Sequence, residues 1–139
     1  MAPAILVTGG AKRIGAVLSR AFGARGWHVV IHYGRSREDA EALAASMPSA
    51  ECVQCDLADG DAAVAMVNDL AARLPDWRMM VNCAAIFVPD SVHALDPEIL
   101  ASTMAVNAAT PTRMAQTYLN VARADGGRRV VQFLDQVEP

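Results

Sequence analysis

The sequence predicts an α/β fold in which a parallel β-sheet is covered by helices on both faces. Three observations support this expectation: short apolar segments alternate with segments of helical periodicity, the connections between them are short, and a glycine-rich turn follows the first apolar segment. Strands that alternate with helices form right-handed βαβ crossovers, which build a parallel sheet. We expect the strand order 3-2-1-4-5 and three layers, α/β/α.

The first part of the chain predicts two strand-helix units. Residues 4–8 form a short apolar run that ends at Gly9-Gly10, and residues 14–24 then carry apolar side chains at helical spacing. Residues 28–33 are rich in β-branched side chains, which predicts the second strand. An Ala-rich helix follows and ends at about Met47, because the next residue is a proline.

Two further units follow the same plan. The third strand is expected at 50–54, before a helix that begins at Asp59, a typical N-cap residue, and ends at Leu74. The fourth strand, 78–81, leads through a loop to a long helical segment at 96–123. That segment opens with Asp as N-cap and Pro in the first turn.

The long helix should be interrupted near its middle. Pro111 removes a backbone donor and clashes with the preceding turn, so we expect a break or kink near Asn107. The helix closes on Gly126-Gly127, and residues 129–134 form the fifth strand. No repeat or linker-like tract is present, so we interpret residues 1–139 as a single domain.

Composition and charge narrow the class of protein. With 53% hydrophobic residues, 19% charged residues and a net charge of -3, the chain is typical of a soluble domain. Its arginines are scattered, so we expect no nucleic-acid partner. No apolar run approaches the roughly 18 residues of a membrane span. The N-terminus lacks the pattern of a signal peptide, and we expect a cytoplasmic location.

Cys52 and Cys55 form a C-x-x-C pair, a spacing also found in metal and redox sites. Because the pair falls in an expected strand, its side chains should point to opposite faces, with α-carbons roughly 10 Å apart and beyond disulfide reach. We interpret both cysteines as small buried side chains and expect no metal.

The turn after the first strand has the composition of a phosphate-binding loop. Gly9 permits a tight turn, and Gly15 permits close approach of helix and strand. The helix N-terminus offers N–H groups and a partial positive charge to a pyrophosphate. This context predicts a Rossmann-like, doubly wound sheet, the alternative being a glycine-rich turn without a ligand. The candidate binding residues here are Thr8, Gly9, Lys12, Arg13, Ile14 and Gly15.

The end of the second strand indicates which dinucleotide is bound. An NAD-binding chain carries Asp or Glu there to bind the ribose 2′-hydroxyl, whereas this chain has Arg35 and Ser36. A guanidinium grips a 2′-phosphate in bidentate fashion, and Arg13 adds a second cation in the glycine turn. We therefore predict NADP(H), with His32 and Tyr33 as further candidate binding residues. The alternative is that Arg35 is a solvated loop charge.

Four motifs in the same order resemble the short-chain dehydrogenase/reductase family over the whole chain. They are Thr8-Gly9 through Ile14-Gly15, Asp56-Leu57, Asn82-Cys83-Ala84-Ala85 and Asn107. The resemblance implies that Asp56 and Leu57 contact the adenine and that Asn82, Ala84 and Ala85 lie along the adenosine ribose. It also implies that Asn107 holds the helix kink and a water of the proton relay. The alternatives are a capping role for Asp56 and a local cap for Asn107.

Departures from the common pattern resemble the pteridine reductase branch. Arg13 stands where the middle glycine usually is, and the run from His32 to Ser36 is similar to that branch. By this resemblance Asp135 takes the place of the usual catalytic Ser and orients or helps to protonate the substrate. Phe87 matches a ring that stacks on a pterin. The alternatives are a strand-end residue that caps a loop for Asp135 and a loop anchor for Phe87.

The resemblance further implies a catalytic Tyr-x-x-x-Lys motif, which residues 1–139 do not contain: the only lysine is Lys12, and neither Tyr33 nor Tyr118 has Lys four residues later. We therefore expect a missing C-terminal half and a sheet that is incomplete on its C-terminal side. The resemblance also implies a homo-oligomer, dimer or tetramer, that pairs through the long helix, by way of Met104, Met114 and Leu119.

The predicted function is that of an NADP(H)-dependent oxidoreductase that transfers hydride to a C=O or C=N group of a small substrate, for which a pterin is one candidate. Two alternatives remain open: a ketone or 3-oxoacyl thioester reductase of the same family, and a noncatalytic NADP(H)-binding module.

Overall fold

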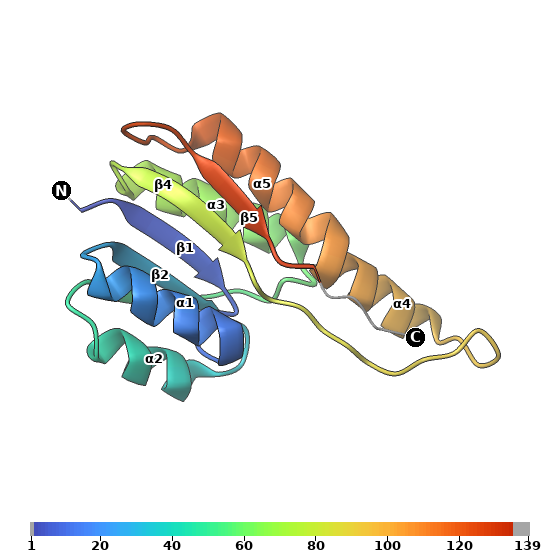
Figure 1. The fold of residues 1–139 in the computed structure, drawn as a ribbon. Helices are drawn as coiled ribbons and strands as arrows, with labels where there is room; N and C mark the ends of the chain where they lie inside the picture. Colours follow the sequence, from blue (N-terminus) through green and yellow to red (C-terminus); the bar gives the residue numbers. More distant parts are fainter. Residues whose placement is uncertain (1, 135–139) are drawn as a thin grey trace.

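A computed structural model describes residues 2–134 and shows a five-stranded parallel sheet in the order β3-β2-β1-β4-β5, as predicted (Figure 1). The strands are β1 (Ala4–Thr8), β2 (His28–Tyr33), β3 (Ala50–Gln54), β4 (Trp77–Asn82) and β5 (Arg129–Gln132). The helices are α1 (Arg13–Ala24), α2 (Arg37–Ala45), α3 (Gly60–Arg73), α4 (Pro97–Met104), the π-helical η1 (Ala105–Ala109) and α5 (Thr110–Val121). In the described part of the chain, no helix is long and apolar enough to cross a membrane.

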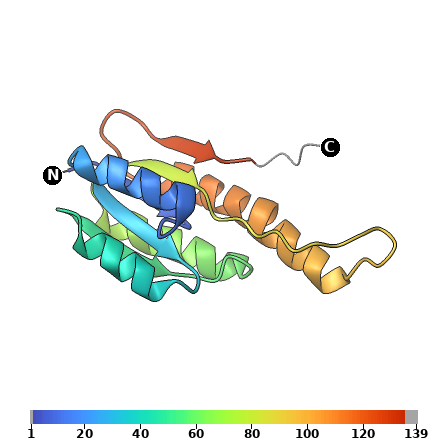
Figure 2. The same cartoon turned by 60° about the horizontal axis from the view of Figure 1, so that its bottom comes forward.

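The helices form two layers because alternate strand residues point to opposite faces of the sheet. Val29 and Ile31 of β2 pack in one cluster with Ala40 and Leu43 of α2 and residues of α1. Val30, between them in sequence, belongs to the other cluster, with residues of α3 and α5. Figure 2 shows these layers from a second direction. The result is the expected α/β/α arrangement.

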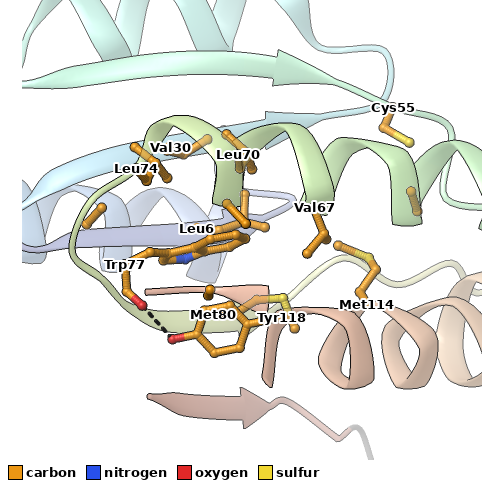
Figure 3. Packing of buried hydrophobic residues seen from close by; sticks show 14 of the residues in the cluster. Leu6, Val30, Cys55, Val67, Leu70, Leu74, Trp77, Met80, Met114 and Tyr118 are labelled. Carbon is orange, nitrogen blue, oxygen red and sulfur yellow. Dashed lines mark hydrogen bonds between the residues drawn. The ribbon is translucent and has the colours of Figure 1, made fainter. Parts of the chain in front are cut away.

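The most deeply buried aromatic pair joins β4 to α5. Trp77 and Tyr118 are both 0% exposed, and their rings meet edge to face with centroids 4.7 Å apart (Figure 3). The Tyr118 hydroxyl donates a hydrogen bond of 2.9 Å to the Trp77 carbonyl, so the buried phenol is satisfied. This pair fixes α5 on the sheet and thereby the position of η1, which continues directly into α5.

The predicted interruption of the long helix takes the form of the π turn η1. Asn107 lies inside it, and the Thr110 N–H donates to the carbonyl of Ala105, five residues back. Pro111 explains the change, since it cannot donate the usual bond to the carbonyl of residue 107. The N-caps Asp59 and Asp96 are confirmed, with side chains that accept from backbone N–H groups of the first helical turn.

Several predicted boundaries differ by one or two residues. The helix expected to reach Met47 ends at Ala45, because the Ser46 hydroxyl donates to the Leu43 carbonyl and the turn tightens there. Strand β5 stops at Gln132 rather than at residue 134. Met114, expected on the oligomer surface, is instead fully buried between α5 and the sheet.

Cys52 and Cys55 face opposite sides of the sheet, as predicted. Cys55 is buried in the cluster beneath α3, whereas Cys52 packs against the cluster beneath α1 and α2. Both are free thiols, and burial is the main cause of their raised pKa values. Within residues 2–134, no group of three or more His, Cys, Asp or Glu side chains is placed to hold a metal ion.

Candidate functional site

The carboxyl ends of the strands surround a cavity of about 790 Å³. Such a volume is typical of a small-molecule site. It lies where the strand order reverses, because β2 and β4 flank β1 on opposite sides, and ligands of doubly wound sheets bind at this point. The lining residues are Gly9, His32, Gly34, Arg35, Gln54, Cys55, Asp56, Leu57, Ala58, Ala84, Ala85, Ile86, Val88, Ser102 and Val106.

The glycine turn at the start of α1 depends on close backbone approach. Gly9 has a φ of +59°, and a Cβ placed there would lie 3.1 Å from the α-carbon of Ala84. A Cβ on Gly15 would lie 2.1 Å from the carbonyl oxygen of Gly9, a clash that only glycine avoids. The turn can therefore pass tightly between β1 and the segment that follows β4.

The N-terminus of α1 has no side-chain cap. The Lys12 side chain, at the N-cap, makes no capping hydrogen bond, and the first turn contains no acidic residue. The Lys12 ammonium instead lies 3.4 Å from a carboxylate oxygen of Asp39, on the surface. Arg13 and Ile14 are also exposed, and neither lines the cavity. This end of the helix therefore combines N–H groups that the N-cap side chain does not satisfy with a positive charge.

The end of β2 directs its residues to different places. Arg35 lines the cavity, and the carbonyl of the adjacent Gly34 accepts a hydrogen bond of 3.1 Å from the Gln54 side chain. Tyr33 is buried on the opposite face, where the Arg37 guanidinium lies 5.9 Å from its ring centroid. The hydroxyl of Ser36, at the N-cap of α2, makes no capping hydrogen bond. Arg35 is the only lysine or arginine among the described residues that line the cavity.

The segment after β4 is held to the end of β1, and the residues after β3 form a local turn. The Thr8 hydroxyl oxygen accepts from the N–H groups of Cys83 (3.0 Å) and Ala84 (3.1 Å), which joins β1 to the segment after β4. Asp56 accepts from the Ala58 N–H at 2.9 Å, and Leu57 is buried beside it. Ala84 lies against Gly9 and lines the cavity, as does Ala85.

Asn82 is 2% exposed, and its side-chain amide has no hydrogen-bond partner among residues 2–134. Cys83 follows it, and burial raises the pKa of that thiol to about 11, so it stays protonated at neutral pH. An unpaired buried amide is costly, which makes Asn82 an unusual feature of this strand end.

Asn107 supports the wall of the cavity from η1. Its amide nitrogen donates to the Ile86 carbonyl at 2.8 Å, and its carbonyl oxygen accepts from the Ile86 N–H at 2.9 Å. Ile86 and Val88 line the cavity, whereas Phe87, between them, is 78% exposed and does not. Asp135 lies outside the described residues.

The predicted site residues thus fall into three groups, and their roles remain predictions. One group does not line the cavity, and its side chains make no contact that shapes it in the described residues: Lys12, Arg13, Ile14, Tyr33, Ser36, Asn82 and Phe87. Those that line the cavity are Gly9, His32, Arg35, Asp56, Leu57, Ala84 and Ala85. Those that hold the strand ends or the loop in place are Thr8, Gly15 and Asn107. Ser102 and Val106 also line the cavity and were not predicted; their spacing of four residues on one helix is the signal that could have found them.

A parallel sheet in this order, a glycine turn before an open helix N-terminus and a cavity at the switch point define a Rossmann-like α/β domain. The chain belongs to the short chain dehydrogenase family, whose model matches residues 3–133.

Similar proteins include several reductases. Pteridine reductase 1 of Leishmania tarentolae is 38% identical over 90 residues, which cover 61% of this chain and 30% of that protein. Granaticin polyketide synthase putative ketoacyl reductase 2 of Streptomyces violaceoruber is 29% identical, covering 92% of this chain and 64% of that protein. The crystal structure of FolM alternative dihydrofolate reductase 1 from Brucella canis, complexed with NADP, matches with a TM-score of 0.86 and 33% identity. That match covers 96% of this chain and 55% of the Brucella chain, so the present chain spans only part of the length of these relatives.

Proposed function

We propose that this chain forms the NADP(H)-binding part of a reductase that transfers hydride to a C=O or C=N group of a small substrate. The observation that carries the proposal is the position of Arg35, which lines the cavity at the end of β2 where a carboxylate would repel a 2′-phosphate. The similar Brucella protein was crystallised with NADP, which supports the same choice of cofactor.

The residues at the glycine turn fit a dinucleotide. Because Gly9 and Gly15 have no Cβ, a ligand can approach the backbone of the turn closely. The first N–H groups of α1 are available to a pyrophosphate. Arg13 and Arg35 would supply positive charge to the phosphates, and Ser36 a hydroxyl donor. Asp56, Leu57, Ala84 and Ala85 would enclose the adenosine.

When bound, the nicotinamide supplies the hydride, and the protein positions it and excludes water. Asn107 holds the Ile86 backbone and so shapes the wall beside Val88. The family resemblance assigns proton delivery to a Tyr-x-x-x-Lys motif, which residues 1–139 do not contain, and substrate orientation to Asp135. These steps belong to the whole enzyme.

The cofactor assignment is tested by titrating the full chain with NADPH and NADH. We expect tight binding of NADPH and weak binding of NADH. Substitution Arg35→Ala should weaken NADPH binding by roughly tenfold or more, as expected for loss of a charge-assisted contact, and leave NADH binding nearly unchanged. Arg25→Ala removes the same charge at the far end of α1 and serves as the matched control. If Arg35→Ala loses affinity for NADPH and NADH equally, the assignment is contradicted.

Pterins are the substrate class that we favour. The similarity to a pteridine reductase and to a FolM protein supports it, whereas the similarity to a ketoacyl reductase supports the alternative of a ketone or 3-oxoacyl thioester. NADPH consumption by the whole enzyme, including the part that carries the Tyr-x-x-x-Lys motif, with a dihydropterin, a ketone and a 3-oxoacyl thioester would separate them. NADPH binding without turnover of any of these would favour a noncatalytic module.

We also propose that the protein is cytoplasmic and pairs through the exposed side of α4 and α5. Leu100, Met104 and Leu119 are each 45% to 55% exposed there, which leaves apolar surface for a second copy. Sedimentation of the full chain, with Met104→Glu as the disrupting variant, tests this pairing.

A further inference from the structure

His32 occupies the point where three strand ends meet. It lies near the end of β2, is 2% exposed and lines the cavity. Its Nδ1 atom accepts a hydrogen bond of 3.0 Å from the Gly9 N–H, just after β1. Its Nε2 atom lies 2.8 Å from the carbonyl oxygen of Cys55, just after β3. Both ring nitrogens are therefore used by the protein's own backbone.

These two partners determine the protonation state of the ring. A carbonyl oxygen can only accept, so Nε2 must carry the hydrogen toward Cys55; a backbone N–H can only donate, so Nδ1 of His32 must be free of hydrogen to accept from Gly9. The imidazole is thus neutral, in the Nε2–H tautomer. A second proton, placed on Nδ1, would face the Gly9 N–H and abolish that hydrogen bond.

Residue 32 holds both glycines at the start of the turn. Its side chain binds the Gly9 N–H, and its backbone carbonyl accepts from the Gly10 N–H at 3.0 Å. Gly9 has a positive φ, which is only one of the many conformations that an unrestrained glycine samples. The His32 ring therefore selects one conformation of the turn against which Gly15 packs.

We propose that His32 is a positioning residue for dinucleotide binding: its neutral imidazole fixes the Gly9 turn, and protonation of the ring releases the turn and weakens the binding. This inference rests on the proposed function. It assigns His32 an action through Gly9, in place of the direct cofactor contact expected from the sequence.

The surroundings favour the neutral ring at physiological pH. Burial lowers the pKa of His32 below its usual value of 6.5, and the hydrogen bond to the Cys55 carbonyl opposes this only in part. The ionisable neighbours are Arg35 and Asp56, which share the cavity, the Cys55 thiol, and Asp59, which acts on that thiol from the start of α3. Strand β1 contributes no ionisable side chain.

The direction of the pH effect follows from the lowered pKa. The neutral ring contributes its full stabilisation above the usual pKa of 6.5, and this contribution is lost as the pH falls through the lower value in the folded protein. Dinucleotide affinity should decline over the same acid range if the turn is released. A bound phosphate that instead attracted a protonated His32 would give the opposite profile.

Two substitutions separate the two hydrogen bonds. Asn places an oxygen near the position of Nδ1, so His32→Asn can keep the bond from Gly9 without titrating. Gln places its amide near the position of Nε2, so His32→Gln can keep the bond to Cys55 and lose the one from Gly9. His28→Asn is the matched control, because His28 lies at the opposite end of β2 and binds Ser49 and Glu51.

The experiment is calorimetric titration of the full chain and these variants with NADP⁺ between about pH 5 and 8. The 2′-phosphate itself titrates in this range, so the informative quantity is the difference between wild type and His32→Asn. We expect His32→Asn to bind NADP⁺ more tightly than His32→Gln at the upper end and to lose the additional acid decline. His32→Gln should bind about three- to tenfold more weakly at every pH, as expected for one lost hydrogen bond. His28→Asn should follow wild type.

Equal weakening in the Asn and Gln variants, or identical pH profiles for wild type and His32→Asn, would overturn the inference. A second measurement does not depend on the cofactor: nitrogen NMR of the full chain should show the Nε2–H tautomer and a Gly9 amide signal that changes as His32 titrates. If wild type binds no NADP⁺, the proposed function fails, and the NMR result alone decides the role of His32. A Gly9 amide signal that is insensitive to the titration overturns it.

Discussion

Arg13 shows at the scale of one residue how this turn departs from a plain glycine loop. It has a φ of +52°, in the left-handed region where a non-glycine residue pays roughly 1–2 kcal/mol. Glycine adopts this region without that cost, because it has no Cβ. A strained arginine beside an open helix N-terminus is understandable if its charge is needed by a phosphate.

Replacement of this residue should separate stability from binding. Arg13→Gly relieves the left-handed strain but adds freedom to the unfolded chain. We therefore expect the free energy of unfolding to increase by less than about 1 kcal/mol. NADPH affinity should fall, because a cation near the pyrophosphate is lost. Denaturant unfolding and NADPH titration of the full chain measure the two effects.

Arg13→Ala is the matched control, since it removes the charge but keeps the strain. It should lose affinity as Arg13→Gly does, without the gain in stability. A glycine variant with unchanged NADPH affinity would mean that Arg13 does not act on the cofactor.

At the scale of elements, the sequence predicted the strands and helices because each has a local signal. Apolar runs mark β1 and β2, and the N-caps Asp59 and Asp96 mark the starts of α3 and α4. The segment between β4 and α4 has no such periodicity, and the contacts that join it to the rest of the fold come from residues far along the chain. The bonds between Ile86 and Asn107 are an example, as they depend on η1. The hydrogen-bond partners of His32 likewise could not be predicted from the sequence, because they come from the ends of other strands.

Asn107 should stabilise the segment after β4 more than the helix that contains it. Asn107→Ala removes two hydrogen bonds and leaves the N–H and carbonyl groups of Ile86 without that partner. We expect the free energy of unfolding to fall by about 1–3 kcal/mol. Amide hydrogen exchange should accelerate at residues 83–96 and change little in α3. Exchange mass spectrometry of the full chain resolves the two regions.

Asn107→Asp provides a finer comparison. Its carboxylate can still accept from the Ile86 N–H but cannot donate to the Ile86 carbonyl, so its effect should lie near that of the alanine variant. Uniform acceleration across the whole chain in either variant would show that Asn107 contributes to global stability and has no specific action on this segment.

At the scale of the whole molecule, the two faces of the edge strand β5 are covered unequally. Val130 packs against the cluster that includes α5, whereas Val131 and Phe133, on the other face, are 39% and 43% exposed. No helix in residues 2–134 covers that face of β5, and α1 and α2 lie over β1 and β2 (Figure 1). The relatives of this chain are longer, and the Brucella structure aligns over 55% of its length.

Residues 1–139 expressed alone should therefore self-associate. An apolar strand with open backbone groups at a sheet edge pairs readily with another copy, and a lysine on such a strand opposes the pairing. We expect sedimentation velocity to show concentration-dependent association of this polypeptide, and Val131→Lys to reduce it while circular dichroism stays unchanged. Val92→Lys introduces the same charge at a residue that is 91% exposed in the loop before α4, and it should not reduce association. If both variants act alike, net charge is responsible and the edge is not; a monomeric parent polypeptide would mean that the exposed face of β5 is tolerated without cover.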